Sequence, residues 1–188
     1  ARWYLLYTSP AWSPTKFDEE GVQEIQSKYF GTLRNVYNFF VLYSNTDDVD
    51  IAGLQIAPKD RPELDLWILS RFNALVRDVT VAEDLSNWYI RRARRRFYAE
   101  EMTEDKKAVL LTTYEMLRGA ALLSAPFAPF IADEMYTKLT GEESVHLAFF
   151  PEAEEALIDT DLEEKMELVR TIVTLGRGER EKEKIKVR

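Results

Sequence analysis

Apolar residues recur every three or four positions along most of the chain, a spacing that predicts amphipathic helices. The first helix is expected from Asp18 to about residue 40, with Asp18 as its cap and Glu19 and Glu20 in the first turn, where the helix dipole favours acids. A second helix is expected from about Pro62 to Val79, because proline is favoured in a first turn. The apolar positions of the two helices are Val22, Ile25, Tyr29, Leu33, Val36 and Phe40, and Leu64, Ile68, Phe72, Leu75 and Val79.

The helical pattern continues in the second half of the chain. Its longest segment is Glu104–Thr140, and because Pro126 and Pro129 interrupt it, the sequence predicts either two helices or one kinked helix there. A capping box at Thr160–Glu163 predicts the start of a last helix. The inner side of that helix is expected to carry Leu162, Met166, Val169 and Val173.

The connections between these segments are short or rich in turn residues. Ser9–Pro14 breaks an apolar start, since both prolines disfavour helical residues before them. No strand-like alternation of useful length and no glycine-rich phosphate loop occurs in the sequence. The predicted fold is therefore all-α, an antiparallel bundle of about five helices.

One predicted helix carries five arginines in six residues, within the stretch Ser86–Tyr98. At helical pitch its apolar positions gather on one side: Tyr89, Ile90, Ala93 and Phe97. Trp88 projects among the arginines, one turn before Arg91 and Arg92. Guanidinium groups match the geometry of phosphates, and an exposed ring can stack on a base. The stretch therefore predicts an RNA-binding face.

An alternative for the same stretch is a solvated helix face whose arginines pair with acidic neighbours, which is common in proteins. Acidic residues are depleted near these arginines in the sequence, and the arginines are closer together than solvation requires. This local footprint of basic and aromatic residues is the one expected of a nucleic-acid-binding surface.

The chain has a net charge of −8, and the excess of acidic residues lies in one segment. Residues 142–167 hold ten acids and a single basic residue, Lys165, so the other 162 residues sum to +1 and leave room for a basic site. With 46% apolar and 31% charged residues, the composition is that of a globular protein. No apolar run of 18 residues, no secretory signal and no cysteine is present, which fits a cytoplasmic location.

The sequence contains few combinations of residues that could form a catalytic site. His146 is the only histidine, so sites that need several histidines, or a Ser-His-Asp or Cys-His arrangement, are not expected. Between two apolar residues, His146 is predicted to be a packed or capping residue. The carboxylates of residues 142–167 are explained by a solvated acidic loop. The chain is not expected to catalyse a reaction alone.

The stretch Asp84–Phe97 closely resembles the signature of the anticodon-binding helical domain of isoleucyl-tRNA synthetases, which are class I aminoacyl-tRNA synthetases. Other stretches resemble the same family in the same order: Arg2–Leu6, Lys16–Glu19, Thr32–Phe40, Asp65–Arg71, Ala125–Phe130, Ser144–Leu147 and Lys184–Arg188. Together they cover nearly the whole chain. Ala125–Phe130 is shared with valyl and leucyl enzymes, whereas Ser-Asn-Trp-Tyr followed by the arginines selects the isoleucyl group.

The resemblance implies a division of the chain and a set of site residues. Residues 1–16 would end the connection from a catalytic domain, residues 17–175 would form the anticodon-binding bundle, and residues 176–188 would begin a C-terminal extension. The positions implied to face the anticodon stem and loop of the tRNA are Asn87, Trp88, Arg91, Arg92, Arg94, Arg95 and Arg96. The positions implied to be scaffold are Asn35, Trp67, Pro126 and Pro129.

The resemblance also implies a longer parent enzyme that activates isoleucine with ATP and magnesium, transfers it to tRNA(Ile), and edits valine in a separate domain. This chain has neither the His-Ile-Gly-His-like nor the Lys-Met-Ser-Lys-Ser-like catalytic motif, so no cofactor is expected in it. The implied partners are tRNA(Ile) and the catalytic and editing domains of the same parent, with no membrane and no DNA.

The chain departs from the family between Val79 and Glu83, where about one further helix is usual. Either that helix is deleted or residues are missing at the join, in which case the capping-box spacing of Thr80–Glu83 is an artefact. Two other functions stay open at this point. One is the equivalent domain of a valyl or leucyl enzyme, and the other is a helical module that docks its basic helix on an acidic protein or an anionic membrane.

Overall fold

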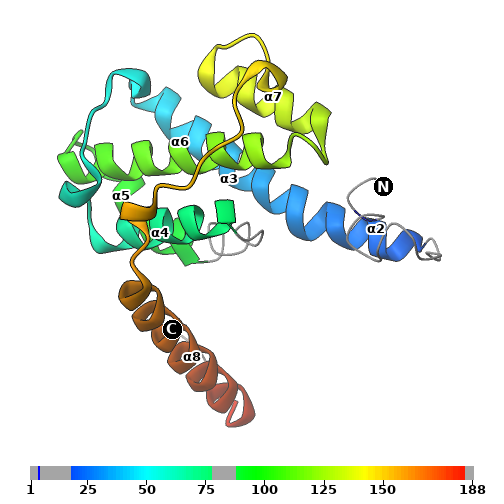
Figure 1. Ribbon diagram of the computed structural model, residues 1–188. Helices are drawn as coiled ribbons and strands as arrows, with labels where there is room; N and C mark the ends of the chain where they lie inside the picture. The colour runs from blue at the N-terminus through cyan, green and yellow to red at the C-terminus, as the bar shows by residue number, and fades with distance from the viewer. Residues whose placement is uncertain (1–3, 5–17, 78–87, 185–188) are drawn as a thin grey trace.

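The computed structural model describes Tyr4, residues 18–77 and residues 88–184, and in these it contains helices and no strand (Figure 1). Its longer elements are α2 (Glu19–Ile25), the π-helical η1 (Gln26–Gly31), α3 (Thr32–Thr46), α4 (Glu63–Arg77), α5 (Arg91–Phe97), α6 (Glu104–Ser124), α7 (Pro129–Thr140) and α8 (Thr160–Lys182). Because α2, η1 and α3 follow one another without a break, the described residues form six helices. The predicted all-α fold is confirmed.

The sixth helix arises where the sequence predicted either a kink or a break. α6 ends at Ser124 and α7 begins at Pro129, so the predicted segment is two helices. Pro129 lies in the first turn of α7, where a missing amide hydrogen has no cost, and Pro126 lies in the exposed turn between the helices.

Short polar side chains begin three of the helices. Asp18, Thr103 and Asp159 each accept a hydrogen bond from a backbone amide in the first turn of α2, α6 and α8. The predicted capping box at Thr160–Glu163 is therefore wrong, because Asp159 caps α8 one residue earlier. At the other end of α7, Gly141 adopts a left-handed conformation, with φ of 73°, which glycine reaches without steric strain.

The core lies around α6, which packs against α3, α4, α5 and α7 (Figure 1). Buried apolar residues of α6 include Val109, Leu110, Met116, Leu117 and Ala121. α4 can approach α6 closely because Gly119 has no side chain: a Cβ at this position would lie 2.0 Å from Cζ of Phe72. Glycine thus weakens the helix locally but allows an aromatic ring to pack directly on its backbone.

The predicted stripe of the first helix is buried only in its second half. Leu33, Val36 and Phe40 are buried, as expected, whereas Val22 and Ile25 are only half-buried. The reason is visible in Figure 1, where α2 extends beyond the bundle that covers α3.

α8 also extends away from the bundle (Figure 1). Leu162 and Met166 pack against the core, as predicted for the inner side of this helix. Val169 was expected on the same side but is exposed, and Val173 is half-buried. The inner side is thus limited mainly to the first two turns, because beyond them the bundle no longer lies beneath the helix.

Several predictions concern residues outside the described part of the chain. These are the Ser9–Pro14 break, the end of the second helix at Val79, the Thr80–Glu83 junction, and Asn87. No helix among the described residues has the length and apolar character needed to cross a membrane.

Candidate nucleic-acid interface

The apolar side of the arginine-rich helix α5 is buried, as the sequence predicted. Tyr89, Ile90, Ala93 and Phe97 all belong to the hydrophobic core. The ring of Phe97 meets that of Phe39 on α3 edge to face, with 4.9 Å between ring centroids and 77° between planes. Because this side is held by α3 and α6, the opposite side of α5 must face solvent.

Four arginines occupy the solvent side of α5. Arg91, Arg92, Arg94 and Arg95 are exposed, and none of the four forms an ion pair with a described carboxylate. We call these four residues the arginine ridge. Four guanidinium groups within five residues create a local positive surface that a polyanion can neutralise.

Trp88 lies at the start of this helix and is half-buried, not the exposed ring expected from the sequence. The guanidinium carbon of Arg92 lies 4.4 Å from the centre of its ring, and that of Arg170 lies 5.4 Å from it. Both are cation–π contacts. Arg170 belongs to α8 and lies 74 residues after Arg96 in the sequence. The tertiary fold therefore adds one more arginine to the site.

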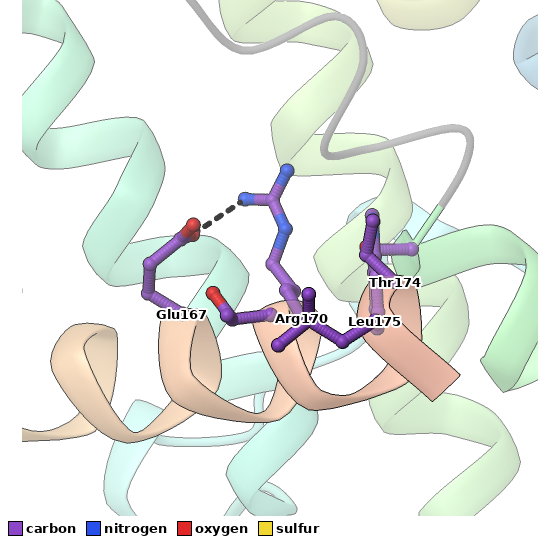
Figure 2. Close-up of a pocket in the computed structure, with 6 residues that line it drawn as sticks. Glu167, Arg170, Thr174 and Leu175 are labelled. Carbon is purple, nitrogen blue, oxygen red and sulfur yellow. Dashed lines mark ion pairs between the residues drawn. The ribbon is translucent and has the colours of Figure 1, made fainter. Parts of the chain in front are cut away.

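Trp88 and residues of α8 line a groove. Figure 2 shows its α8 side, with Glu167, Arg170, Thr174 and Leu175 labelled. The groove has a volume of about 300 Å³ and is lined by Trp88, Glu167, Arg170, Thr171, Thr174 and Leu175. Within it, Nη1 of Arg170 lies 3.3 Å from Oε2 of Glu167, one turn earlier on α8. A second hollow of about 300 Å³ shares these two residues and continues toward Trp67, Arg71, Glu163 and Glu164.

Two polar residues of α4 hold the beginning of α8 in place beside this groove. Ser70 Oγ accepts a hydrogen bond from the amide of Asp159 at 2.8 Å and donates one to Oε1 of Glu163 at 2.5 Å. Asn73 Oδ1 accepts from the amide of Glu154 at 2.7 Å. Both α4 side chains are buried, so these bonds fix the direction in which α8 leaves the bundle.

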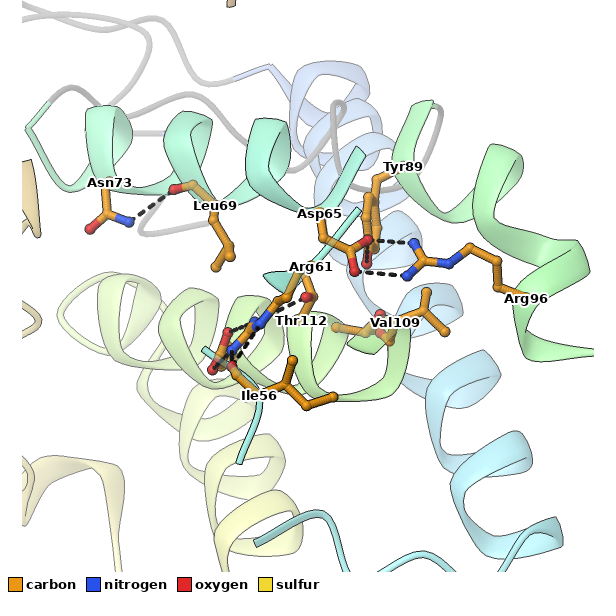
Figure 3. A network of polar contacts seen from close by, with 11 residues as sticks. Ile56, Arg61, Asp65, Leu69, Asn73, Tyr89, Arg96, Val109 and Thr112 are labelled. Carbon is orange, nitrogen blue, oxygen red and sulfur yellow. Dashed lines mark hydrogen bonds and ion pairs between the residues drawn. The ribbon is translucent and has the colours of Figure 1, made fainter. Parts of the chain in front are cut away.

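The fifth arginine, Arg96, points the other way, into the protein (Figure 3). Its Nη1 and Nη2 donate to Oδ1 and Oδ2 of Asp65 at 2.5 Å and 2.8 Å, and its Nε lies 3.0 Å from Oδ1 of Asp105. The hydroxyl of Tyr89 donates to the same Asp65 at 2.9 Å. We call Asp65, Tyr89 and Arg96 the inner anchor. The expectation that Arg96 faces the RNA does not fit this geometry.

Burial and charge act on the ionisation of the inner anchor. The side chain of Asp65 is 0% exposed and that of Arg96 is 14% exposed. Burial, and then the charge of Asp65, raise the pKa of Tyr89 well above its usual value of 10. Burial by itself lowers the pKa of Arg96, but its hydrogen bonds to Asp65 and the attraction of that carboxylate outweigh this, and the pKa is raised. The anchor therefore keeps a protonated phenol and a charged guanidinium at neutral pH.

The expected scaffold and histidine positions have mixed outcomes. Trp67 is fully buried in the core, in agreement with a scaffold role. Asn35 is exposed on α3, which does not fit the expected scaffold role. His146 is also exposed, and Ser144, not the imidazole, caps this short turn by accepting from the His146 amide. The prediction that His146 is packed is wrong, because the 3-10 turn at Val145–Leu147 turns the imidazole outward.

Within the described ranges, no cluster of three or more histidine, aspartate or glutamate side chains is arranged to hold a metal ion. Two acids that line the hollows beside the candidate interface, Glu163 and Glu167, are engaged by Ser70, Arg71 and Arg170.

The chain resembles known tRNA ligases and a domain family of tRNA ligases. A family model described as the anticodon-binding domain of tRNA ligase matches residues 80–188. Proteins named isoleucine–tRNA ligase match the full length of the chain, at 42% identity in Porphyromonas gingivalis, 42% in Deinococcus radiodurans and 38% in Clostridium acetobutylicum.

The chain spans about a fifth of the length of these relatives, from 18% to 20%. The matches extend over 206, 205 and 216 residues, although the chain itself has 188. Each match is therefore at least 17 positions longer than the chain.

Proposed function

Because the chain belongs to the anticodon-binding domain family of tRNA ligases, we propose that it is the tRNA-binding part of an isoleucine–tRNA ligase. In this role it holds the anticodon stem and loop of tRNA(Ile) on the arginine ridge, with Trp88 and Asn87 beside it. One observation carries the proposal: α5 is fixed from behind by its buried side, and four arginines remain on its open side without a carboxylate partner among the described residues.

The arginine ridge suits an RNA backbone for a simple physical reason. Each guanidinium can make two parallel hydrogen bonds to a phosphate, and each phosphate that is neutralised releases counterions. Since α5 is already anchored, binding orders only the arginine side chains and not the helix. Little of the favourable free energy of the contacts is therefore offset by the cost of ordering the protein.

The identity of the relatives favours isoleucine over valine or leucine as the amino acid of the longer enzyme. In this proposal, that enzyme activates isoleucine with ATP and magnesium in the cytoplasm and transfers it to the tRNA. Residues 17–175 form the RNA-binding bundle, and residues 1–16 and 176–188 lead to neighbouring parts of the same chain. We assign no catalytic residue and no cofactor to the residues described above.

Fluorescence anisotropy with a labelled tRNA(Ile) transcript tests the proposal. The wild-type chain is compared with Arg91→Ala/Arg92→Ala and with Arg34→Ala/Lys138→Ala, a control that removes two exposed charges on the α7 side of the bundle. We expect the ridge variant to bind roughly ten-fold more weakly, because two phosphate contacts are lost, and the control to change affinity less than about two-fold.

Competition with a mixed tRNA pool tests the choice of tRNA in the same assay. We expect unlabelled tRNA(Ile) to displace the label at lower concentration than the pool does. Absence of tRNA binding, or equal weakening by the ridge variant and its control, would overturn the proposal. Binding to anionic vesicles or to an acidic protein without binding to tRNA would support the docking module instead.

A further inference from the structure

The groove between Trp88 and α8 contains a combination of side chains that phosphate binding alone does not require. An aromatic ring and the guanidinium of Arg170 lie 5.4 Å apart, centroid to carbon. Beside them are a carboxylate, two threonine hydroxyls and an apolar side chain, those of Glu167, Thr171, Thr174 and Leu175. Flat surfaces together with both hydrogen-bond donors and acceptors are what a nucleobase needs from a binding site.

Charge separates the two kinds of contact that an RNA can make here. On the α5 side, the arginine ridge attracts phosphates. On the α8 side, Glu163 and Glu167 are ion-paired with Arg71 and Arg170, and Glu164 adds a further negative charge, so the two neighbouring hollows do not attract phosphates. A base carries no charge, and its N–H groups can donate to a carboxylate, so the side that does not attract the backbone can still accept a base.

We propose that the groove between Trp88 and α8 receives one unstacked nucleobase of the bound RNA. The inference rests on the proposed function and adds α8 to the RNA-binding surface. The base adds a further planar group to the cation–π contacts that Arg92 and Arg170 make with the Trp88 ring, since bases stack on both aromatic rings and guanidinium planes. Glu167 holds Arg170 in position through its ion pair of 3.3 Å, and the two threonine hydroxyls are available to the edge of the base.

The placement of the groove depends on contacts distant from it. Ser70 and Asn73 on α4 fix residues 154–163, and through them the start of α8. The inner anchor fixes α5. A base bound beside Trp88 and Arg170 therefore contacts two elements whose relative position is already set, and the groove need not be assembled on binding.

The test measures whether one RNA base and Arg170 act together. A series of anticodon stem-loops of tRNA(Ile) is prepared in which each loop nucleotide in turn is made abasic, and each RNA is titrated against wild-type protein and against Arg170→Lys. Lysine keeps the charge but lacks the planar group, so the variant removes stacking and leaves the attraction to phosphates.

We expect one abasic RNA to bind the wild-type protein roughly ten-fold more weakly, as for the loss of a base–aromatic stack. Arg170→Lys should weaken binding of the unmodified RNA by a similar factor. When this variant is titrated with the abasic RNA, the abasic change should weaken binding by less than about two-fold more. Such non-additivity at a single position is the signature of direct contact. Arg177→Lys, an exposed arginine of α8 that does not line the groove, is the matched control and should leave all affinities unchanged.

Additive losses at every loop position, or unchanged affinity in Arg170→Lys, would overturn the base site. If the wild-type protein still binds tRNA and still depends on Arg91 and Arg92, the proposed function survives this failure. If the wild-type protein binds no tRNA, the proposed function and the base site fail together. Thermal unfolding of both lysine variants verifies that each is folded during the titrations.

Discussion

The two sides of α5 carry the same residue type in opposite roles. On the outer side, Arg94 and Arg95 are exposed and have no carboxylate partner among the described residues. On the inner side, Arg96 binds Asp65 with both terminal nitrogens. One position along the helix thus separates an arginine available to a ligand from one that holds the helix in place.

The difference teaches that the environment decides what an arginine does. Asp65 is fully buried, so its attraction for Arg96 acts in a medium of low polarity and is strong, but the desolvation of both groups offsets much of the gain. An exposed arginine faces water and salt, and its ion pairs contribute about 0–1 kcal/mol to stability. The same guanidinium is therefore structural inside and free to bind outside.

Arg61 is a second example on the inner side of the fold. Its guanidinium lies against α6, bound to both carboxylate oxygens of Glu115 and to Oγ1 of Thr112, and it also donates to the carbonyl of Ile56 (Figure 3). Like Arg96, it forms a bidentate pair with a carboxylate of another helix. Arg61 connects the segment before α4 to Glu115 of α6, whereas Arg96 connects α5 to Asp65 of α4.

Arg96→Ala is expected to give the largest effect on stability. It leaves the carboxylate of Asp65 buried with only the Tyr89 hydroxyl as a described partner, and removing one member of a buried pair costs about 3–5 kcal/mol. The free energy of unfolding, measured by chemical denaturation, should fall by about this amount.

Asp65→Ala provides the comparison for that variant. The remaining Arg96 side chain is 14% exposed and keeps Asp105 within 3.0 Å, so it retains some solvent and one partner. We therefore expect a smaller loss from Asp65→Ala than from Arg96→Ala. A loss below about 1 kcal/mol in Arg96→Ala, the size typical of an exposed pair, would contradict the anchoring role.

Arg94→Ala/Arg95→Ala is expected to act on RNA affinity and not on stability. Each lost phosphate contact lowers the slope of log affinity against log salt concentration by about 0.7 to 0.9. The slope for tRNA(Ile), measured by anisotropy over a salt series, should therefore become shallower by roughly 1.4 to 1.8. The free energy of unfolding should change by about 0.5 kcal/mol or less.

The comparison between the two sides of α5 fails if this double variant unfolds as readily as Arg96→Ala. It also fails if the salt slope is unchanged, because the arginine ridge would then make no phosphate contact. Arg34→Ala/Lys138→Ala serves again as the control of equal charge.

Tyr89→Phe is expected to lower stability less than Arg96→Ala does. It removes one hydrogen bond to Asp65, which costs about 1 kcal/mol at neutral pH. The raised pKa means that the folded protein holds the phenol proton more tightly than the unfolded chain, in which tyrosine ionises near pH 10. Stability from this group is therefore complete below about pH 10 and is lost as the pH rises above it.

Denaturation at about pH 8 and about pH 11 measures this dependence, and Tyr89→Phe should lose less stability between them than the wild-type protein does. Part of the dependence of stability on pH must remain in Tyr89→Phe, because burial also raises the pKa of Tyr29 to about 12. An unchanged difference between the two pH values in Tyr89→Phe would show that Tyr89 does not contribute to it.

The local pattern of apolar and polar residues predicted the structure correctly where burial follows from helical spacing alone. The apolar sides of α5 and of α3, and the break at Pro126 and Pro129, could all be predicted in this way. The inner side of α8 was predicted too long, because periodicity does not tell where the neighbouring bundle ends. Polar residues within an apolar helix, such as Ser70 and Asn73, were the available signal that another segment docks on α4.

The candidate site was found from the density of arginines, but its composition was not. Arg170 lies just after the acidic segment 142–167 and is brought to Trp88 by the docking of α8. The direction of Arg96 was likewise hidden, since Asp65 lies 31 residues away in the chain. Neither contact has a local signature.

The order of apolar and polar residues, by itself, determined that this protein is helical and that α5 buries one side and presents arginines on the other. Those properties depend on helical periodicity and on the cost of exposing apolar surface, both of which act between near neighbours. Only the tertiary structure decided which arginine turns inward and which helix completes the groove at Trp88. Such choices depend on charges and rings that are far apart in sequence and meet only when the chain has folded.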